Sequence, residues 1–463
     1  MTITFRRISE SVNYPGSSIL VFWQQLTAQT PATAFSNSFQ QQQQPTTTIP
    51  MASQAQQHQA DSVVSLASRV MALAQRHAAV TKEGGDATTA RAALCAACEE
   101  LAVTTTAPEA WLCQTAASSH TAAALAILLE TDIITRLCET AEPVAGPTLL
   151  KDVGDDATPA LFRCALRQCA ASRLLDEPVP GHFQRNPRTE LLHDPYIRDW
   201  IHYLVDDGLR CASWLSRYAT QNDYHIPDER HRSAFELAFN TNTPCYDYYR
   251  QLDPPRGQRF DNAMEGYFRM NAPTPIEDII AFPTFCPADG VVVDVGGGRG
   301  HHSLRLAQKY PRMRFIVQDY ASEAPNTSSI TPDPGLRERV RWIKHDFFDE
   351  QPVRGAAVYL LSHILMDHPD RESQKILEYL AEAMDARSTL LVDDFFDPGD
   401  RRFGSPQGIA LALHLIACRG TAFRTMEQWT ALFARVPVLT VKECRMLEHG
   451  RVVIRVSRRI GVE

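Results

Sequence analysis

The spacing of apolar residues changes once along the chain, near residue 281. Before this point, apolar residues recur every three or four positions, as in "SVVSLASRVMALAQRHA" (62–78) and "TAAALAILLETDIITRLCE" (121–139). That spacing puts apolar side chains on one face of a helix, so we expect a helical N-terminal half. Further helices are expected between 194 and 270, for example in "YIRDWIHYLVDDGLRCASWL".

One segment of this half predicts a helix followed by a hairpin. "TPALFRCALRQCAASRLLDE" (158–177) has helical spacing, and "PVPGHFQRNPRTELLHD" (178–194) predicts a short hairpin that turns at Pro180-Gly181. A helix followed by a hairpin resembles a winged helix, which often binds DNA. Few Lys and Arg residues face a plausible groove, so we expect a structural role or a substrate lid instead.

After about residue 281, short apolar runs alternate with helical stretches. This alternation predicts an α/β fold, a Rossmann-like, doubly wound and mostly parallel sheet. The final segment, 438–459, predicts two antiparallel strands that close the sheet. The apolar runs are "GVVVDV", "RFIVQDY", "RVRWIKHDFF", "AAVYLLSHIL" and "STLLVDDFF".

We divide the chain into four regions. Residues 1–60, with the run Gln40 to Gln44, are expected to be disordered. Residues 61–195 form a helical dimerisation and winged-helix-like domain, 196–280 are linking helices, and 281–463 form the Rossmann-like domain. No apolar run suits a signal-peptide core or a membrane span.

Composition and cysteine usage narrow the classes of partner. The net charge of −8 gives no electrostatic reason to expect nucleic acid or an anionic membrane as a partner. The 11 cysteines are scattered, and Cys95 and Cys98 form a lone C-x-x-C without a second pair at zinc spacing. Buried thiols in a reducing, cytoplasmic compartment are therefore expected, with no metal.

A Gly-rich turn stands where the first of these strands meets a helix. It reads Asp294-Val-Gly296-Gly-Gly298-Arg-Gly300, and Asp319 ends the next strand. Glycines allow the backbone to approach a ligand closely, and an acid at that place can hold both hydroxyls of a ribose. The pattern indicates a nucleoside-type cofactor.

The carboxylate of Asp294 allows a choice between two nucleoside-type cofactors, NAD and S-adenosylmethionine. A carboxylate there disfavours the pyrophosphate of NAD and suits the ammonium group of S-adenosylmethionine. Asp346 ends the following strand, and with Phe347 it is placed to bind and pack an adenine. We therefore predict S-adenosylmethionine as the cofactor, held by Asp294, Gly296, Gly298, Asp319, Asp346 and Phe347.

From about residue 62 to 460 the chain resembles the fungal and plant class I O-methyltransferases, the dimeric type with an N-terminal helical domain. The matching segments are "DVGGGRG", "VQDY", "HDFF", "ILMDHPD" and "FRTMEQW". This resemblance implies bound S-adenosylmethionine, a small-molecule substrate and an intertwined homodimer.

The chain departs from that family at its catalytic segment. The family's I-L-H-D-W-x-D segment carries a histidine that deprotonates the substrate, and Met366 stands at that position here. Of the two carboxylates that orient the histidine in the family, one falls at Asp394 and the other is replaced by Phe423. A thioether cannot accept a proton at neutral pH, and a general base commonly contributes about 10²–10⁴-fold to rate. We place Met366, Asp394 and Phe423 in the substrate pocket.

His363, three residues before Met366, is a candidate for a displaced base. Strand alternation is expected to point it away from Met366, so a buried structural histidine is the favoured interpretation over a displaced base.

The combination of an intact cofactor turn and a missing base is similar to the methyltransferase-like pericyclases of fungal secondary metabolism. The resemblance implies dehydration of a polyketide/pyridone-type substrate and Alder-ene or hetero-Diels–Alder closure, with the cofactor retained for its positive charge. We predict Lys344, His345 and His182 as donors to the substrate. Two alternatives are kept: an O-methyltransferase of an acidic phenolic or pyridone hydroxyl, and an inactive partner that dimerises with an active homologue.

Overall fold

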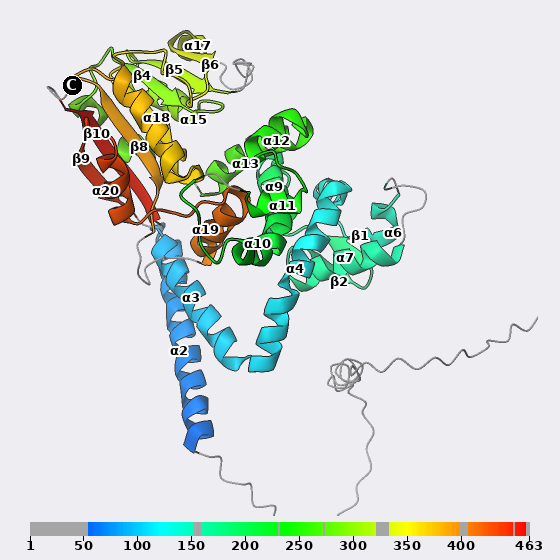
Figure 1. Cartoon of the computed structure of the whole chain (residues 1–463). Helices are drawn as coiled ribbons and strands as arrows, with labels where there is room; N and C mark the ends of the chain where they lie inside the picture. The colour runs from blue at the N-terminus through cyan, green and yellow to red at the C-terminus, as the bar shows by residue number, and fades with distance from the viewer. Residues whose placement is uncertain are drawn as a thin grey trace, which may run out of the picture. The chain divides into compact units, whose positions relative to one another are not determined.

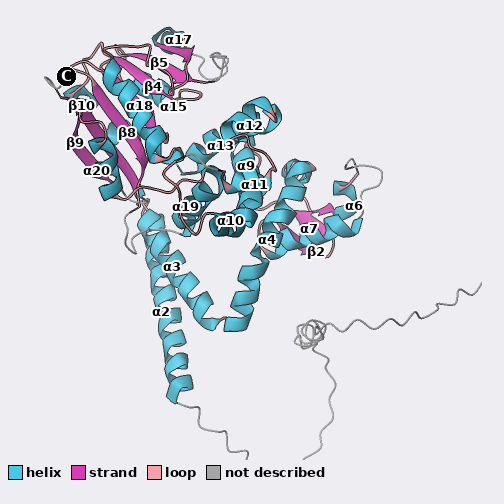
Figure 2. Cartoon of the chain, viewed as in Figure 1, coloured by secondary structure: helices cyan, strands magenta, loops and turns pink. Residues whose placement is uncertain are grey.

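The computed structural model describes residues 54–151, 153, 159–229, 232–271, 274–320, 333–397, 406–447 and 450–459 (Figures 1 and 2). The chain divides into two compact units, residues 1–107 and 108–463. The predicted disorder of residues 1–60 falls mostly outside the described residues, although a helix already begins at Gln54.

The first unit is a pair of helices, α2 (Gln54–Lys82) and α3 (Thr88–Thr105). The apolar periodicity of 62–78 lies within α2, as predicted. Arg69 and Glu100 form an ion pair between the two helices, and Ala97 is buried. Most other side chains of the pair are exposed, because two helices alone bury little surface.

The second unit begins with helices and a small sheet. Antiparallel strands join in the order β1-β3-β2, and Gly181 makes the β2–β3 turn with φ +78°. The helix and the hairpin predicted for 158–194 are therefore present. Their elements are α4 (Pro108–Glu130), α5 (Ile133–Cys138), β1 (Val144–Ala145), α6 (Gly146–Leu149), α7 (Pro159–Ala171), β2 (Asp176–Val179) and β3 (His182–Gln184).

Helix α4 also has the length and apolarity of a membrane span. Its most apolar stretch has a mean hydropathy of 1.3, and 22% of that stretch is buried. Trp111 and Leu112 are exposed on it. The expectation that no membrane is involved stays a prediction.

Helices follow, and most of them pack their apolar faces together around Trp200, Phe235 and Tyr249. The helices of this cluster are α9 (Pro195–Tyr203), the π-helix η1 (Leu204–Gly208), α10 (Leu209–Gln221), α11 (Ala234–Ala238), α12 (Cys245–Gln251) and α13 (Pro254–Asn271). The short helix α8 (Pro187–Leu191) precedes them, and α14 (Ile276–Ile279) and the 3₁₀ turn η2 (Phe282–Thr284) follow and pack on the large sheet.

The rest of the unit is a seven-stranded sheet in the order β6-β5-β4-β7-β8-β10-β9. The five strands from β6 to β8 are parallel, and β10 is antiparallel to both of its neighbours. The predicted doubly wound sheet with two closing antiparallel strands is confirmed. The strands are β4 (Val291–Val295), β5 (Arg314–Asp319), β6 (Val340–Lys344), β7 (Val358–Ser362), β8 (Thr389–Phe395), β9 (Leu439–Met446) and β10 (Arg451–Arg458).

Helices cover both faces of this sheet (Figure 1). Leu377 and Trp429 bring α18 and α20 onto one face, and Leu306 and Leu336 bring α15 and α17 onto the other. Buried on both faces, the central strands are almost wholly apolar. The remaining elements are α15 (His301–Lys309), α17 (Pro334–Arg339), η3 (Leu365–Asp367), α18 (Asp370–Ala383), α19 (Pro406–Arg419) and α20 (Met426–Ala434).

Candidate active site

The Gly-rich turn joins β4 to α15 and needs glycine for two reasons. Gly296, Gly298 and Gly300 have φ angles of +72°, +53° and +78°, which side chains with a Cβ rarely adopt. A Cβ on Gly296 would also lie 2.5 Å from Cδ1 of Ile364. The turn therefore leaves its backbone open to a ligand at the carboxyl ends of the parallel strands, where ligands bind in such sheets.

Two of the predicted acids contact this turn. Asp294 is 1% exposed, and its Oδ2 accepts a 2.7 Å hydrogen bond from Ser303 Oγ. Burial raises the pKa of Asp294 to about 6. Asp319 Oδ2 accepts a 3.0 Å hydrogen bond from the backbone N–H of Gly298. Asp294 thus binds the start of α15, just after the turn, while Asp319 binds the backbone of the turn itself.

Asp346 and Phe347 complete the predicted cofactor set. Asp346 Oδ1 accepts from the N–H of Phe348 at 2.9 Å, which fixes the bend after β6. The ring of Phe347 lies 3.5 Å from the point where a Cβ on Gly296 would stand. The structure therefore brings the predicted residues together at the ends of β4, β5 and β6, an arrangement that fits a nucleoside cofactor.

Met366 follows β7 and lies in an apolar cluster. Its side chain packs with Phe395, Leu415 and Phe423, and the rings of Phe395 and Phe423 stack at 5.3 Å. Thr421 Oγ1 donates a 2.8 Å hydrogen bond to the Met366 carbonyl. The three predicted pocket residues, Met366, Asp394 and Phe423, thus lie in one place.

The carboxyl group of Asp394 serves the main chain. It accepts hydrogen bonds from the N–H of Met366 at 3.1 Å and from its neighbour Phe395 at 2.9 Å. Burial raises the pKa of Asp394 to about 8, so this carboxyl is largely neutral at pH 7. In the family, a histidine at position 366 would favour the charged form of this carboxyl group. Met366 carries no charge and does not do so.

Arg424 fixes the segment that carries Met366. Its side chain is 7% exposed and donates to the carbonyls of Leu365 and His368 at 2.6 and 2.7 Å and to Asp370 Oδ1 at 2.8 Å. Because one guanidinium holds three points of this loop, the position of Met366 is set by tertiary contacts.

β7 ends at Ser362, and His363 has a left-handed backbone with φ +56°, so strand alternation does not decide the direction of its side chain. Its ring lies 5.2 Å from that of Phe395, which is a member of the cluster around Met366. Its Nδ1 lies 3.1 Å from Ser362 Oγ, and burial lowers the pKa of His363. The histidine is hydrogen-bonded and buried, as the favoured interpretation expected.

The predicted donors lie elsewhere. Lys344 ends the edge strand β6 and is exposed, with Nζ 5.4 Å from the Tyr320 ring centroid. Two strands separate β6 from β7, which at about 4.8 Å per strand step puts Lys344 and His345 roughly 14 Å from the segment after β7. Burial lowers the pKa of His345. Lys344 and His345 thus lie beside the cofactor acids rather than beside Met366.

His182 begins β3 in the small sheet. It is exposed, and its Nδ1 lies 3.4 Å from the carbonyl of Pro180. Within the described part of the chain, no contact that we find joins it to the cluster around Met366. The catalytic roles of His182, Lys344 and His345 stay predictions, and their positions do not favour them.

Two buried polar groups near the site escaped the sequence analysis. Asp393 is fully buried beside Asp394, and Arg451 donates to both of its oxygens at 2.7 Å. Tyr246 donates to Asp367, which also faces Arg419. The only hint in the sequence was an arginine that ends the otherwise apolar run "GIALALHLIACR".

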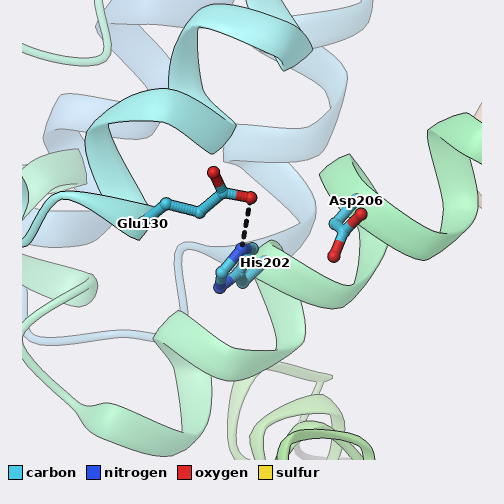
Figure 3. Close-up of side chains that lie close together, drawn as sticks. All are labelled: Glu130, His202 and Asp206. Atoms are coloured by element: carbon cyan, nitrogen blue, oxygen red, sulfur yellow. Dashed lines mark ion pairs between the residues drawn. The ribbon is translucent and has the colours of Figure 1, made fainter. Parts of the chain in front are cut away.

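Among the described residues, one group of three offers ligand atoms close enough for a metal: Glu130, His202 and Asp206 (Figure 3). Arg256 and Arg259 both bind Asp206 Oδ2, at 2.7 and 2.5 Å. Two guanidinium groups already neutralise this carboxylate, so the group does not suit a cation.

The fold and the site define a class. A seven-stranded sheet with one reversed strand next to its edge, a Gly-rich turn after β4, and acids after β5 and β6 are the features of a class I methyltransferase. The profile of the O-methyltransferase domain family matches residues 225–436. The chain belongs to this O-methyltransferase family, and its cofactor is S-adenosylmethionine.

Relatives and solved structures agree with this assignment. The N-methyltransferase nanE of Aspergillus nanangensis is 38% identical over 397 residues, which cover 85% of this chain and 97% of that protein. The structure of LepI in complex with S-adenosylmethionine has a TM-score of 0.69 at 22% identity and covers 86% of this chain and 100% of that one. A structure described as a pericyclic reaction enzyme has a TM-score of 0.67 at 22% identity with the same coverage.

Proposed function

We propose that this chain methylates a small molecule of fungal secondary metabolism at a nucleophile that needs no side-chain base. Such nucleophiles are an amine-type nitrogen and an acidic hydroxyl. The observation that carries the proposal is Met366, bonded through its N–H to the buried Asp394, in the same segment as Ile364, which lies against Gly296 of the Gly-rich turn. S-adenosylmethionine supplies an electrophilic methyl group on a cationic sulfur.

The chemistry of the nucleophile explains why a thioether is tolerated. A neutral amine already carries a free lone pair, and an acidic hydroxyl ionises in water, so neither needs a histidine at position 366. Holding the nucleophile against the methyl group then supplies most of the rate. The similarity to nanE, 38% over nearly its whole length and by name an N-methyltransferase, supports nitrogen as the acceptor.

A second candidate is the O-methyltransferase-like pericyclase predicted from the sequence. The apolar side chains around Met366 and Phe423 favour it, because apolar surroundings strengthen the field of a nearby charge. In this reaction a pyridone-type substrate loses water and closes by an Alder-ene or hetero-Diels–Alder step, and the cofactor is not consumed.

One assay separates the two. The purified full chain is incubated with S-adenosylmethionine and, in turn, an aromatic amine, a phenol and a pyridone alcohol, and both S-adenosylhomocysteine and product mass are followed. Methyl transfer predicts S-adenosylhomocysteine in a one-to-one ratio with a product that has gained a methyl group. Loss of water or isomerisation without S-adenosylhomocysteine would overturn methyl transfer and support the pericyclase.

We further propose that the chain is a cytoplasmic homodimer, with residues 61–195 as its dimerisation and winged-helix-like domain. The exposed apolar side chains of α4 are suited to a second copy. All 11 cysteines are free thiols, which suits a reducing compartment.

A further inference from the structure

A polar pocket is lined in part by Asp367, His368 and Pro369, the residues that follow Met366 in the chain. It is formed where the starts of α11 and α12, the segment after β7, the first turn of α18 and the end of α19 meet. Lining residues include Glu236, Tyr246, Asp367, His368, Glu372 and Arg419. The pocket therefore adjoins the apolar cluster around Met366 through consecutive residues of one segment.

Arg419 is the residue of this pocket whose hydrogen bonding is incomplete. Its side chain is only 7% exposed, and its buried Nη1 has no hydrogen-bond partner among the described residues. Leaving a buried donor unpaired costs about 1–3 kcal/mol, and more for a charged group. A ligand oxygen that accepts from Nη1 removes this cost.

The neighbours of Arg419 hold the guanidinium in place without satisfying Nη1. Nε lies 3.8 Å from Asp367 Oδ2, and the group stacks 4.1 Å from the centroid of the Tyr246 ring. Tyr246 donates its own hydroxyl to Asp367. Asp367 is thus occupied by Tyr246 and Nε.

Helix α19 carries both halves of the site. Leu415, in the cluster with Met366 and Phe423, lies four residues before Arg419. Residues four apart share one face of a helix. One face of α19 therefore presents an apolar side chain and a cationic donor next to each other.

We propose that Arg419 binds an oxygen of the substrate, a carbonyl or enolate oxygen that is conjugated with the substrate's ring. The guanidinium stabilises the deprotonated form of such a substrate, while the released proton goes to water. This charge takes over part of the task that a base at position 366 performs in the family. The inference rests on the proposed function only in placing the substrate beside Met366.

The test is a titration with 7-hydroxycoumarin, a planar, ionisable probe whose phenol and phenolate forms differ in fluorescence excitation. The full chain is saturated with S-adenosylhomocysteine, so no turnover occurs. We expect the phenolate-to-phenol ratio of the bound probe to be at least ten times that of the free probe at the same pH. Arg419→Met and Arg419→Gln should abolish this shift and weaken binding about tenfold or more.

Arg419→Gln keeps a hydrogen-bonding group at this position and serves as the test if Arg419→Met unfolds. The matched control is Arg455→Met, which removes a partly exposed arginine of β10 and should leave both readouts unchanged. No binding of the probe to the unmodified chain, or equal ionisation with and without Arg419, would overturn the proposal. Because the titration involves no turnover, failure of the methyl-transfer assay leaves this result unaffected, and the reverse also holds.

Discussion

The backbone N–H of Met366 donates a 3.1 Å hydrogen bond to Oδ2 of Asp394. The carboxyl group that is matched to the orienting carboxylate of the family therefore binds the main chain of the residue that replaced the histidine. Burial raises the pKa of this carboxyl group to about 8. If the matching with the family holds, the side chain at position 366 cannot act as a base, and Asp394 instead holds the main chain at that position.

Restoring the family's residues at this place should restore base-dependent chemistry. Met366→His combined with Phe423→Glu would return an imidazole and a second carboxylate beside Asp394. We expect S-adenosylhomocysteine formation with a simple phenol to rise at least tenfold, within the ~10²–10⁴-fold range of general-base catalysis. The matched control is Met366→Leu, which changes the side chain without adding a base. A folded double variant with no gain contradicts the assignment of position 366.

The pKa of Asp394 predicts how stability depends on pH. Its folded pKa of about 8 lies above its ordinary value of 3.8, so the neutral form stabilises the fold fully below about pH 4. That contribution is lost as the pH rises toward 8. Relative to Asp394→Asn, which stays neutral, the unmodified chain should lose on the order of 1 kcal/mol per pH unit between pH 5 and 8. Melting curves at several pH values test this, and parallel curves for both proteins would contradict it.

Asp319 should matter for cofactor affinity. Its carboxylate accepts a hydrogen bond from the N–H of Gly298 and is predicted to accept hydrogen bonds from the ribose hydroxyls of the cofactor. A hydrogen bond to a charged group contributes about 1.5–3 kcal/mol. We expect Asp319→Asn to weaken S-adenosylhomocysteine binding about 10- to 100-fold in calorimetry. Asp278→Asn breaks an exposed ion pair with Lys309 and should leave affinity unchanged. Equal affinities for both variants would place the ribose elsewhere.

The proposed homodimer predicts a response to charge on α4. Leu112 is 69% exposed, and Leu112→Glu should weaken self-association at least tenfold in sedimentation experiments, because a buried unpaired carboxylate is costly at an interface. Leu252→Glu places the same charge on a leucine that is 58% exposed and lies outside residues 61–195, and it serves as the control. A chain that is monomeric before any substitution would refute the dimer directly.

Two arginines on β10 should differ strongly in their contributions to stability. Arg451 binds the fully buried Asp393 through two 2.7 Å hydrogen bonds, so Arg451→Met leaves a buried charge unpaired and should cost about 3–5 kcal/mol. Arg455 pairs with the partly exposed Glu443 on β9, and Arg455→Met should cost about 0–1 kcal/mol. Melting temperatures of the two variants provide the comparison.

Local sequence pattern determined the sheet and the cofactor turn. Each of these features can be recognised within a short stretch of sequence. They are the apolar strands, the glycines at 296, 298 and 300, and the acids at 294, 319 and 346. Strand burial and backbone sterics act over a few residues, so the order β4, turn, α15, β5 could be predicted before the structure. The replacement of the histidine by Met366 was likewise visible in the sequence alone.

Only the tertiary structure decided which polar groups face the substrate side. His363 lies after the end of β7 with a left-handed backbone, and its contact with the ring of Phe395 could not be predicted from strand alternation. Lys344, whose role as a donor stays a prediction, ends β6, and two strands lie between β6 and β7. Arg419 and Tyr246, far apart in sequence, meet at Asp367 because α12 and α19 pack beside the segment after β7. Such contacts depend on how elements that are distant in the sequence pack together. The spacing of residues along the chain does not predict this packing.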